Sequence, residues 1–165
     1  MATNHTTSAL VEGAMQQFTE KCRKAGLKLT HQRSQTYKLL LQVPDHPTAE
    51  TLHKRLLVSL PSLSLDTVYR TLATLEECNL VRRIQTAESQ ARFEAVCEQH
   101  HHLICNQCKR VVDFAWHEVD TLSVPSPVTD WGTIETRNMV IYGTCAACLR
   151  ATDETTEISQ VHTCT

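Results

Sequence analysis

Apolar residues recur every three or four positions through the first half of this 165-residue chain, in runs separated by Gly and Pro. This period is that of amphipathic helices. The first run lies between Ser8 and Lys24, and Gly26 marks its end. Its apolar stripe consists of Leu10, Val11, Ala14, Met15, Phe18 and Cys22. We therefore expect the chain to begin with a helix that buries this stripe.

Three more helices are predicted by residues suited to cap a helix N-terminus. Thr30, Thr48 and Ser64 each precede a helical run, and a hydroxyl at that position can accept from a backbone N–H of the first turn. Pro44 and Pro61 stop the second and third helices. The residues expected inside are Tyr37, Leu40 and Leu41, then Ala49, Leu52, Leu56 and Leu57, then Leu65, Val68, Leu72 and Leu75. Four short capped helices in succession predict a compact bundle.

The fourth helix has a polar face near its N-terminus. If its apolar residues face the core, the other side carries Asp66, Thr67, Tyr69, Arg70 and Thr71. That end of a recognition helix meets base edges and phosphates in DNA complexes. On the helix alone, an ordinary amphipathic helix with a polar face is the favoured interpretation.

Two short alternating runs then predict a hairpin. Residues 80–84 and 91–96 read as strands, and the polar residues 85–90 between them read as a turn. Helices followed by a hairpin indicate a winged helix-turn-helix, whose wing would carry Arg82, Arg83 and Arg92 toward a DNA backbone. We expect this DNA-binding domain to cover residues 1–96 and a hinge to cover 97–99.

The second half predicts a smaller α/β domain. Residues 102–105, 110–114 and 133–142 read as strands, 116–122 as a short helix, and 123–127 as a loop. We place this domain at 100–150 and expect the polar segment from 151 to 165 to be disordered.

Two Cys-x-x-Cys turns stand in this second half. Two residues between cysteines make a tight turn that directs both sulfurs to one point, about 2.3 Å from a shared ion. Two such pairs indicate a four-thiolate cage of Cys105, Cys108, Cys145 and Cys148. A structural zinc is the favoured occupant, with iron in the same cage, or disulfides, as alternatives. A closed four-thiolate site leaves no open position for chemistry.

Charge and composition narrow the class of protein. Residues 1–90 hold 11 Lys+Arg against 8 Asp+Glu, a net of +3, whereas residues 91–165 hold 5 against 10, a net of −5. The N-terminal half is therefore the half suited to a polyanion. The polar N-terminus lacks an apolar signal core, and no run reaches membrane-spanning length. We expect a cytoplasmic protein with no membrane partner, in which paired cysteines hold metal.

The order of these features resembles the ferric uptake regulator (Fur) superfamily, most closely its peroxide-sensing (PerR-like) branch. The stretches that carry the resemblance are Leu29 to Arg33, His46 to Glu50, Thr67 to Leu72, Arg92 to Glu94, His100 to Cys108, and Tyr142 to Cys145. The resemblance implies an α+β homodimer that represses transcription, with an N-terminal winged helix, a C-terminal dimerisation domain and a palindromic operator.

The resemblance also implies a regulatory Fe(II) or Mn(II) at the hinge. The residues at the matching positions are His46, Glu94, His100, His102 and Asp113. Imidazole and carboxylate donors suit Fe(II) or Mn(II), whereas four thiolates suit zinc. In a strand, His100 and His102 share one face and His101 points away. Metal would fix the two domains against each other and act as a corepressor.

Two of these positions divide peroxide sensors from iron sensors. Peroxide-sensing relatives carry Asp at the position of Asp113, and the residues oxidised in them match His46 and His100. Glu94 and Arg70 are more typical of the iron-sensing branch, so an iron-sensing repressor is the alternative. A zinc-uptake repressor is less favoured, because Cys97 stands at an odd offset from Glu94.

Other features receive simpler interpretations. Many relatives have a further metal site at the positions of His101, Asp120 and Arg137. Since arginine cannot ligate a cation, we expect that site to be absent or badly weakened and His101 to be exposed.

Cys22, Cys78 and Cys97 read as small apolar residues, and Cys164 lies in the tail. We expect no enzyme: a metal-dependent hydrolase needs a general base that is not evident, and an electron carrier has no use for a winged helix. A thiol switch that releases zinc on oxidation stays a rival.

Overall fold

The computed structural model describes residues 8–84, 90–95, 99–134 and 137–151. It divides the chain into two compact units, Met1–Glu98 and Gln99–Thr165, here called the helical unit and the sheet unit. Residues 97 and 98 of the predicted hinge, and the predicted tail from residue 152 onward, lie outside the described residues. Residues 146–151 are helical, so residue 151 belongs to a helix and not to the expected tail.

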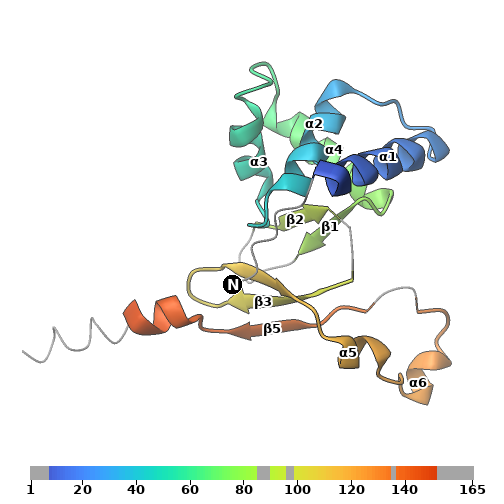
Figure 1. Ribbon diagram of the computed structural model, residues 1–165, viewed down its shortest axis with the longest axis vertical. Coiled ribbons are helices and arrows are strands. Elements are labelled where there is room, and N and C mark those ends of the chain that lie inside the picture. Colours follow the sequence, from blue (N-terminus) through green and yellow to red (C-terminus); the bar gives the residue numbers. More distant parts are fainter. Residues whose placement is uncertain (1–7, 85–89, 96–98, 135–136, 152–165) are drawn as a thin grey trace, which may run out of the picture. The chain divides into compact units, whose positions relative to one another are not determined.

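The helical unit contains α1 (Ser8–Lys24), α2 (His31–Gln42), α3 (Ala49–Leu56) and α4 (Leu65–Glu77) (Figure 1). All three predicted caps are confirmed. Thr30 Oγ1 accepts a hydrogen bond from the N–H of Arg33 at 3.2 Å. Thr48 accepts from the N–H of Thr51 at 3.2 Å, and Ser64 accepts from the N–H of Thr67 at 3.1 Å. Each cap satisfies a backbone donor that has no partner within its own helix, which fixes where the helix begins.

One apolar core holds the four helices together. Phe18 of α1 stacks on Tyr37 of α2 with ring centroids 4.7 Å apart, and both side chains are buried. Leu52 of α3 and Leu72 of α4 are also buried in this core. The prediction for Leu10 is wrong: its side chain, in the first turn of α1, is 61% exposed and lies outside the core.

A two-stranded antiparallel sheet follows the helices. It pairs β1 (Val81–Ile84) with β2 (Arg92–Ala95), with Val81 opposite Ala95 and Ile84 opposite Arg92. Ile84 and Phe93 bury their side chains, which fixes the register of the hairpin. Helices followed by this hairpin confirm the winged-helix prediction.

The sheet unit is built on three strands in the order β4-β3-β5. These are β3 (His101–Cys105), β4 (Val111–Phe114), antiparallel to β3, and β5 (Val140–Gly143), parallel to it. Two short helices, α5 (His117–Thr121) and α6 (Ser126–Thr129), lie between β4 and β5 along the chain (Figure 1).

The sequence overestimated the last strand and missed α6. Residues 133, 134 and 137–139 are not in a strand, and residues 126–129, partly read as loop, are helical.

The sheet unit has little apolar core of its own. Among the described residues, only Ile104, Cys105 and Val111 of this unit are buried apolar side chains, whereas the helical unit buries 16 apolar residues. The unit must therefore be held by something other than its core. No helix in the described part of either unit is long and apolar enough to cross a membrane.

Candidate metal centres and recognition helix

The parallel pairing of β3 with β5 brings the two Cys-x-x-Cys turns together. Cys105 ends β3 and lies opposite Gly143 of β5, two residues before Cys145. The chain then turns between Cys105 and Cys108, with Lys109 in the left-handed region at φ 59°. The four sulfurs all lie within 4.8 Å of one another. Cys105 and Cys148 are 3.9 Å apart and Cys108 and Cys145 are 3.7 Å apart.

These distances fit one metal ion. Four thiolates about 2.3 Å from a tetrahedral zinc lie about 3.8 Å from one another, whereas a disulfide needs about 2.05 Å. The four cysteines are free thiols in the structure. Backbone N–H groups, that of Cys145 first, lower the pKa of Cys105 to about 6, which favours the thiolate that a metal needs. Hydrogen bonding to Cys145 raises the pKa of Cys148 to about 12, so a proton on this thiol would have to leave when a metal ion binds. The cage is suited to a structural zinc.

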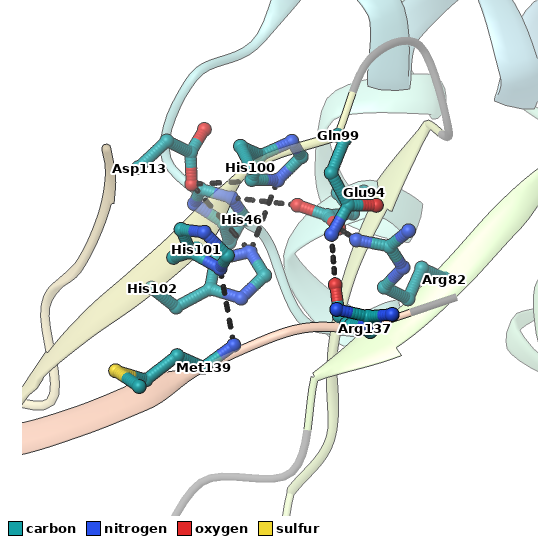
Figure 2. Close-up of polar contacts among 10 residues, drawn as sticks. All are labelled: His46, Arg82, Glu94, Gln99, His100, His101, His102, Asp113, Arg137 and Met139. Atoms are coloured by element: carbon teal, nitrogen blue, oxygen red, sulfur yellow. Dashed lines mark hydrogen bonds and ion pairs between the residues drawn. The ribbon is translucent and has the colours of Figure 1, made fainter. Parts of the chain in front are cut away.

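A second set of possible metal ligands lies at the other end of β3, where the strand begins. The β3–β4 register places His102 opposite Asp113, and His100 precedes β3 by one residue. The Nε2 atoms of His100 and His102 are 3.1 Å apart, and Asp113 Oδ1 lies 3.9 and 3.6 Å from them (Figure 2). His102 is completely buried.

The helical unit has a pair of the same chemistry. His46 Nε2 lies 3.1 Å from Glu94 Oε2, and both side chains are buried (Figure 2). The pair forms because the loop before α3 runs beside β2: the N–H of Phe93 donates to the carbonyl of Pro47 at 3.0 Å. Arg92 donates to the carbonyl of His46, whose φ of 45° is left-handed. Arg82 Nη1 lies 3.4 Å from the other Glu94 oxygen.

Within each unit, the distance between the ligand atoms fits two ligands bound to one metal ion. Two ligand atoms about 2.1 Å from one ion, at 90–109° to each other, lie about 3.0–3.4 Å apart. The pairs His46–Glu94 and His100–His102, each at 3.1 Å, meet this value, and the two contacts of Asp113 exceed it by a few tenths of an ångström. Nitrogen and oxygen donors of this kind suit Fe(II) or Mn(II).

The prediction that His101 is exposed is wrong. Its side chain has no exposed surface, and its Nδ1 accepts from the N–H of Met139 at 3.1 Å (Figure 2). Its Nε2 lies 3.4 Å from Asp120 Oδ1, and its ring lies 5.5 Å from that of Phe114. Arg137, exposed, donates to the backbone carbonyl of Leu122 at 2.5 Å. His101 is buried because it stands on the middle strand of the sheet, where Asp120 of α5 and the ring of Phe114 lie against it.

The outer face of α4 carries four of the five polar residues expected there, three of them exposed and one half-buried. Tyr69 is 45% exposed and donates from its hydroxyl to Glu50 Oε1 at 2.5 Å. Arg70 and Asp66 form an exposed ion pair one helical turn apart. Thr67, half-buried, lies with its hydroxyl 2.8 Å from that of Ser64.

Two of the expected DNA contacts need correction. Thr71 is only 6% exposed and faces the core beside Leu72, so its side chain is not available to DNA. Of the wing arginines, Arg83 is exposed, whereas Arg82 is half-buried and turned toward Glu94.

The comparison with protein families agrees with this architecture. A model of the ferric uptake regulator family matches residues 24–142. The chain belongs to that family. The Fur-family fold, with helices, sheets and a four-cysteine cluster, confirms the predicted fold class, and the chain is a metal-dependent transcriptional regulator of the family.

Individual Fur-family relatives are similar over most of their length. The peroxide-responsive repressor PerR of Staphylococcus epidermidis is 30% identical over 139 residues, which are 84% of this chain and 92% of the relative. A ferric uptake regulator of Pseudomonas aeruginosa, solved with manganese, is 28% identical with a TM-score of 0.64, covering 78% of this chain and 97% of that one. The Helicobacter pylori ferric uptake regulator has a TM-score of 0.69 at 24% identity, covering 84% and 93%, and shows the shared fold.

Sequence reasoning missed one residue beside the exposed face of α4. Glu50 lies in the first turn of α3 and holds the hydroxyl of Tyr69 on α4. Nothing in the spacing of residues 50 and 69 predicts this contact, because it depends on how α3 packs against α4.

Proposed function

We propose that this Fur-family chain is a homodimeric repressor that senses peroxide through Fe(II) or Mn(II). The ligands would be His46 and Glu94 from the helical unit and His100, His102 and Asp113 from the sheet unit. The observation that carries the proposal is that each unit already holds its own donors at ligand spacing. A single ion that takes both sets would tie a winged-helix domain (1–96) to a dimerisation domain (100–150) through a hinge at 97–99.

The residues of the chain have distinct roles in this proposal. His46 and Glu94 would hold the ion to the loop before α3 and to β2, while His102 and Asp113 would hold it to neighbouring strands of the sheet. Bound Fe(II) would supply the one-electron chemistry by which peroxide oxidises a neighbouring imidazole. His46 and His100 are the imidazoles that we propose are oxidised, and an oxidised ring is a poorer donor. Loss of a donor releases the two units from each other and ends DNA binding.

DNA binding is assigned to the exposed N-terminal part of α4. Asp66, Thr67, Tyr69 and Arg70 would lie in the major groove, and Arg83 would contact phosphates from β1. Two such helices in a dimer would meet successive major grooves of a palindromic operator, about 34–36 Å apart. Arg82 would contribute to the wing mainly by holding Glu94.

A second copy of the chain is the partner proposed for the exposed face of the sheet. Leu103, Val112 and Ile141 lie side by side across β3, β4 and β5, because Leu103 is in register with both of the others. They are 42%, 45% and 38% exposed. A row of three apolar side chains on a unit with little core suits burial in a dimer.

An iron-sensing repressor is the alternative function. Glu94 and Arg70 favour it, whereas Asp113 and the similarity to peroxide-responsive repressors favour a peroxide sensor. The two functions differ in what ends repression, which is oxidation of a ligand in one and loss of Fe(II) in the other.

Peptide mass spectrometry separates the two. Protein loaded with Fe(II) without oxygen is given a small excess of hydrogen peroxide. A gain of one oxygen on the peptides that carry His46 or His100, together with loss of DNA binding, supports the peroxide sensor. Unmodified ligands, with DNA binding that follows the Fe(II) concentration, support the iron sensor. The peptide with His31, an exposed residue at the start of α2, is the internal control, and Mn(II)-loaded protein controls for oxidation without iron.

A further inference from the structure

The contact between Tyr69 and Glu50 determines what Tyr69 can offer to DNA. Glu50 stands in the first turn of α3, half-buried, and its Oε1 accepts the hydroxyl proton of Tyr69 at 2.5 Å. Tyr69 is nearly half exposed on the face of α4. Its ring therefore reaches solvent while its hydroxyl proton is directed back to the protein.

The direction of this hydrogen bond is fixed by its chemistry. An ionised carboxylate only accepts, so the phenol must be the donor. The same bond raises the pKa of Tyr69 and lowers the pKa of Glu50, so the phenol stays protonated and the carboxylate stays ionised at neutral pH. A phenol has one proton. With that proton held by Glu50, the oxygen of Tyr69 offers only lone pairs to a ligand.

We propose that Glu50 makes Tyr69 a hydrogen-bond acceptor toward DNA, so that Tyr69 reads the exocyclic amino group of adenine or cytosine in the major groove. This inference rests on the proposed DNA contact of α4. The amino groups of adenine N6 and cytosine N4 are the donors that base edges present there. Phosphate oxygens are acceptors, so they pair poorly with a tyrosine whose proton is held elsewhere.

The neighbouring ion pair has a different role. Asp66 forms an ion pair with the guanidinium of Arg70. The N–H groups of Arg70 that Asp66 does not use can donate to guanine or to phosphate. Asp66 makes no hydrogen bond to Tyr69 among the contacts of the described residues. Removing the charge of Asp66 or of Glu50 changes the net charge of this surface equally, but only Glu50 holds the tyrosine proton.

The experiment uses the full chain, loaded with zinc and Mn(II), and a randomised double-stranded DNA library whose bound fraction is sequenced. Tyr69→Phe removes the acceptor and keeps the ring. Glu50→Gln removes the charge but keeps a carbonyl oxygen that can accept the proton, whereas Glu50→Ala removes both. Asp66→Asn is the matched charge control. Circular dichroism and zinc content show that each variant is folded.

The proposal expects one position in each half-site where the protein prefers an amino-bearing base, and where Tyr69→Phe reduces the preference about fivefold or more. Glu50→Ala should reduce it as much, and Glu50→Gln should keep it. Glu50→Ala added to Tyr69→Phe should have no further effect at that position, while Asp66→Asn should act equally in both backgrounds.

Two results overturn the proposal in different ways. If Glu50→Gln loses the preference as fully as Glu50→Ala, or if Glu50→Ala keeps it, Glu50 does not act through the tyrosine proton and this inference alone is wrong. If Tyr69→Ala and Arg70→Ala leave DNA binding unchanged, α4 does not contact DNA, and the proposed function and this inference both fail.

Discussion

Removal of zinc should unfold the sheet unit while the helical unit stays folded. The change can be made by Cys145→Ser, which removes one ligand of the cage, or by a strong chelator. The reason lies in the uneven distribution of buried apolar residues. The helical unit has a continuous core from Phe18 to Phe93, whereas the sheet unit buries only Ile104, Cys105 and Val111 among its described apolar residues.

The magnitude follows from comparing the two sources of stability. Full burial of Ile104 and Val111 contributes about 1.5–3 kcal/mol each, or about 3–6 kcal/mol together. Binding of a structural zinc by thiolates contributes about 10–16 kcal/mol at neutral pH. Zinc therefore stabilises the sheet unit about two to five times as much as its apolar core does. A domain with a total stability of about 5–15 kcal/mol would lose most or all of it with that contribution.

Hydrogen exchange read by peptide mass spectrometry measures the two units separately. In the zinc-loaded chain, amides of β3 and of α4 should both exchange slowly. After chelation, amides of β3, β4 and β5 should exchange at the rate of an unfolded chain, while those of α2 and α4 stay protected. Cys78→Ser is the control, because Cys78 caps α4 and lies outside the cage. The reasoning would be refuted if the amides of β3 still exchange slowly in protein that is shown to contain no zinc.

Three further outcomes are expected. Tyr69→Ala and Arg70→Ala should each weaken operator binding by about 1–3 kcal/mol, measured by gel shift or fluorescence anisotropy, with zinc content and oligomeric state unchanged. Leu72→Ala should lower the unfolding free energy of the helical unit by about 2–5 kcal/mol in urea titration, because Leu72 is 1% exposed in the core. Leu103→Asp should convert the dimer to a monomer in analytical ultracentrifugation, while Val58→Asp, at an 89% exposed position, should leave it a dimer.

Local signals were enough to predict the helices and the cysteine cage. A capping hydroxyl acts within three residues of its own position, so Thr30, Thr48 and Ser64 could be identified from their neighbours alone. A Cys-x-x-Cys turn is local in the same way. The two turns meet because β3 pairs in parallel with β5. This meeting could still be predicted, because four thiolates can share one ion only if the two turns lie together.

Burial of polar residues could not be predicted in this way. Thr71 follows Arg70 on α4, and the helical period places residue 71 at the boundary between the two faces. Its burial depends on how closely the hairpin and the other helices pack on that boundary. His101 alternates away from His100 and His102, and this led to the expectation of exposure. Alternation predicts the face of the sheet but does not predict whether that face is covered.

The backbone of His46 shows how the helical unit positions its part of the proposed sensing site. A left-handed φ at a non-glycine residue costs about 1–2 kcal/mol. Here it is held by Arg92, which donates to the His46 carbonyl at 3.2 Å, and by the adjacent hydrogen bond between Phe93 and Pro47. The conformation places the imidazole against Glu94, so the helical unit supplies a preassembled pair.

The sheet unit supplies His102 opposite Asp113 through strand register alone. With both sets of ligands formed within their own units, the free energy of binding the proposed metal would go mainly into fixing one unit against the other, which is the change that the proposed repressor must make to bind a palindrome.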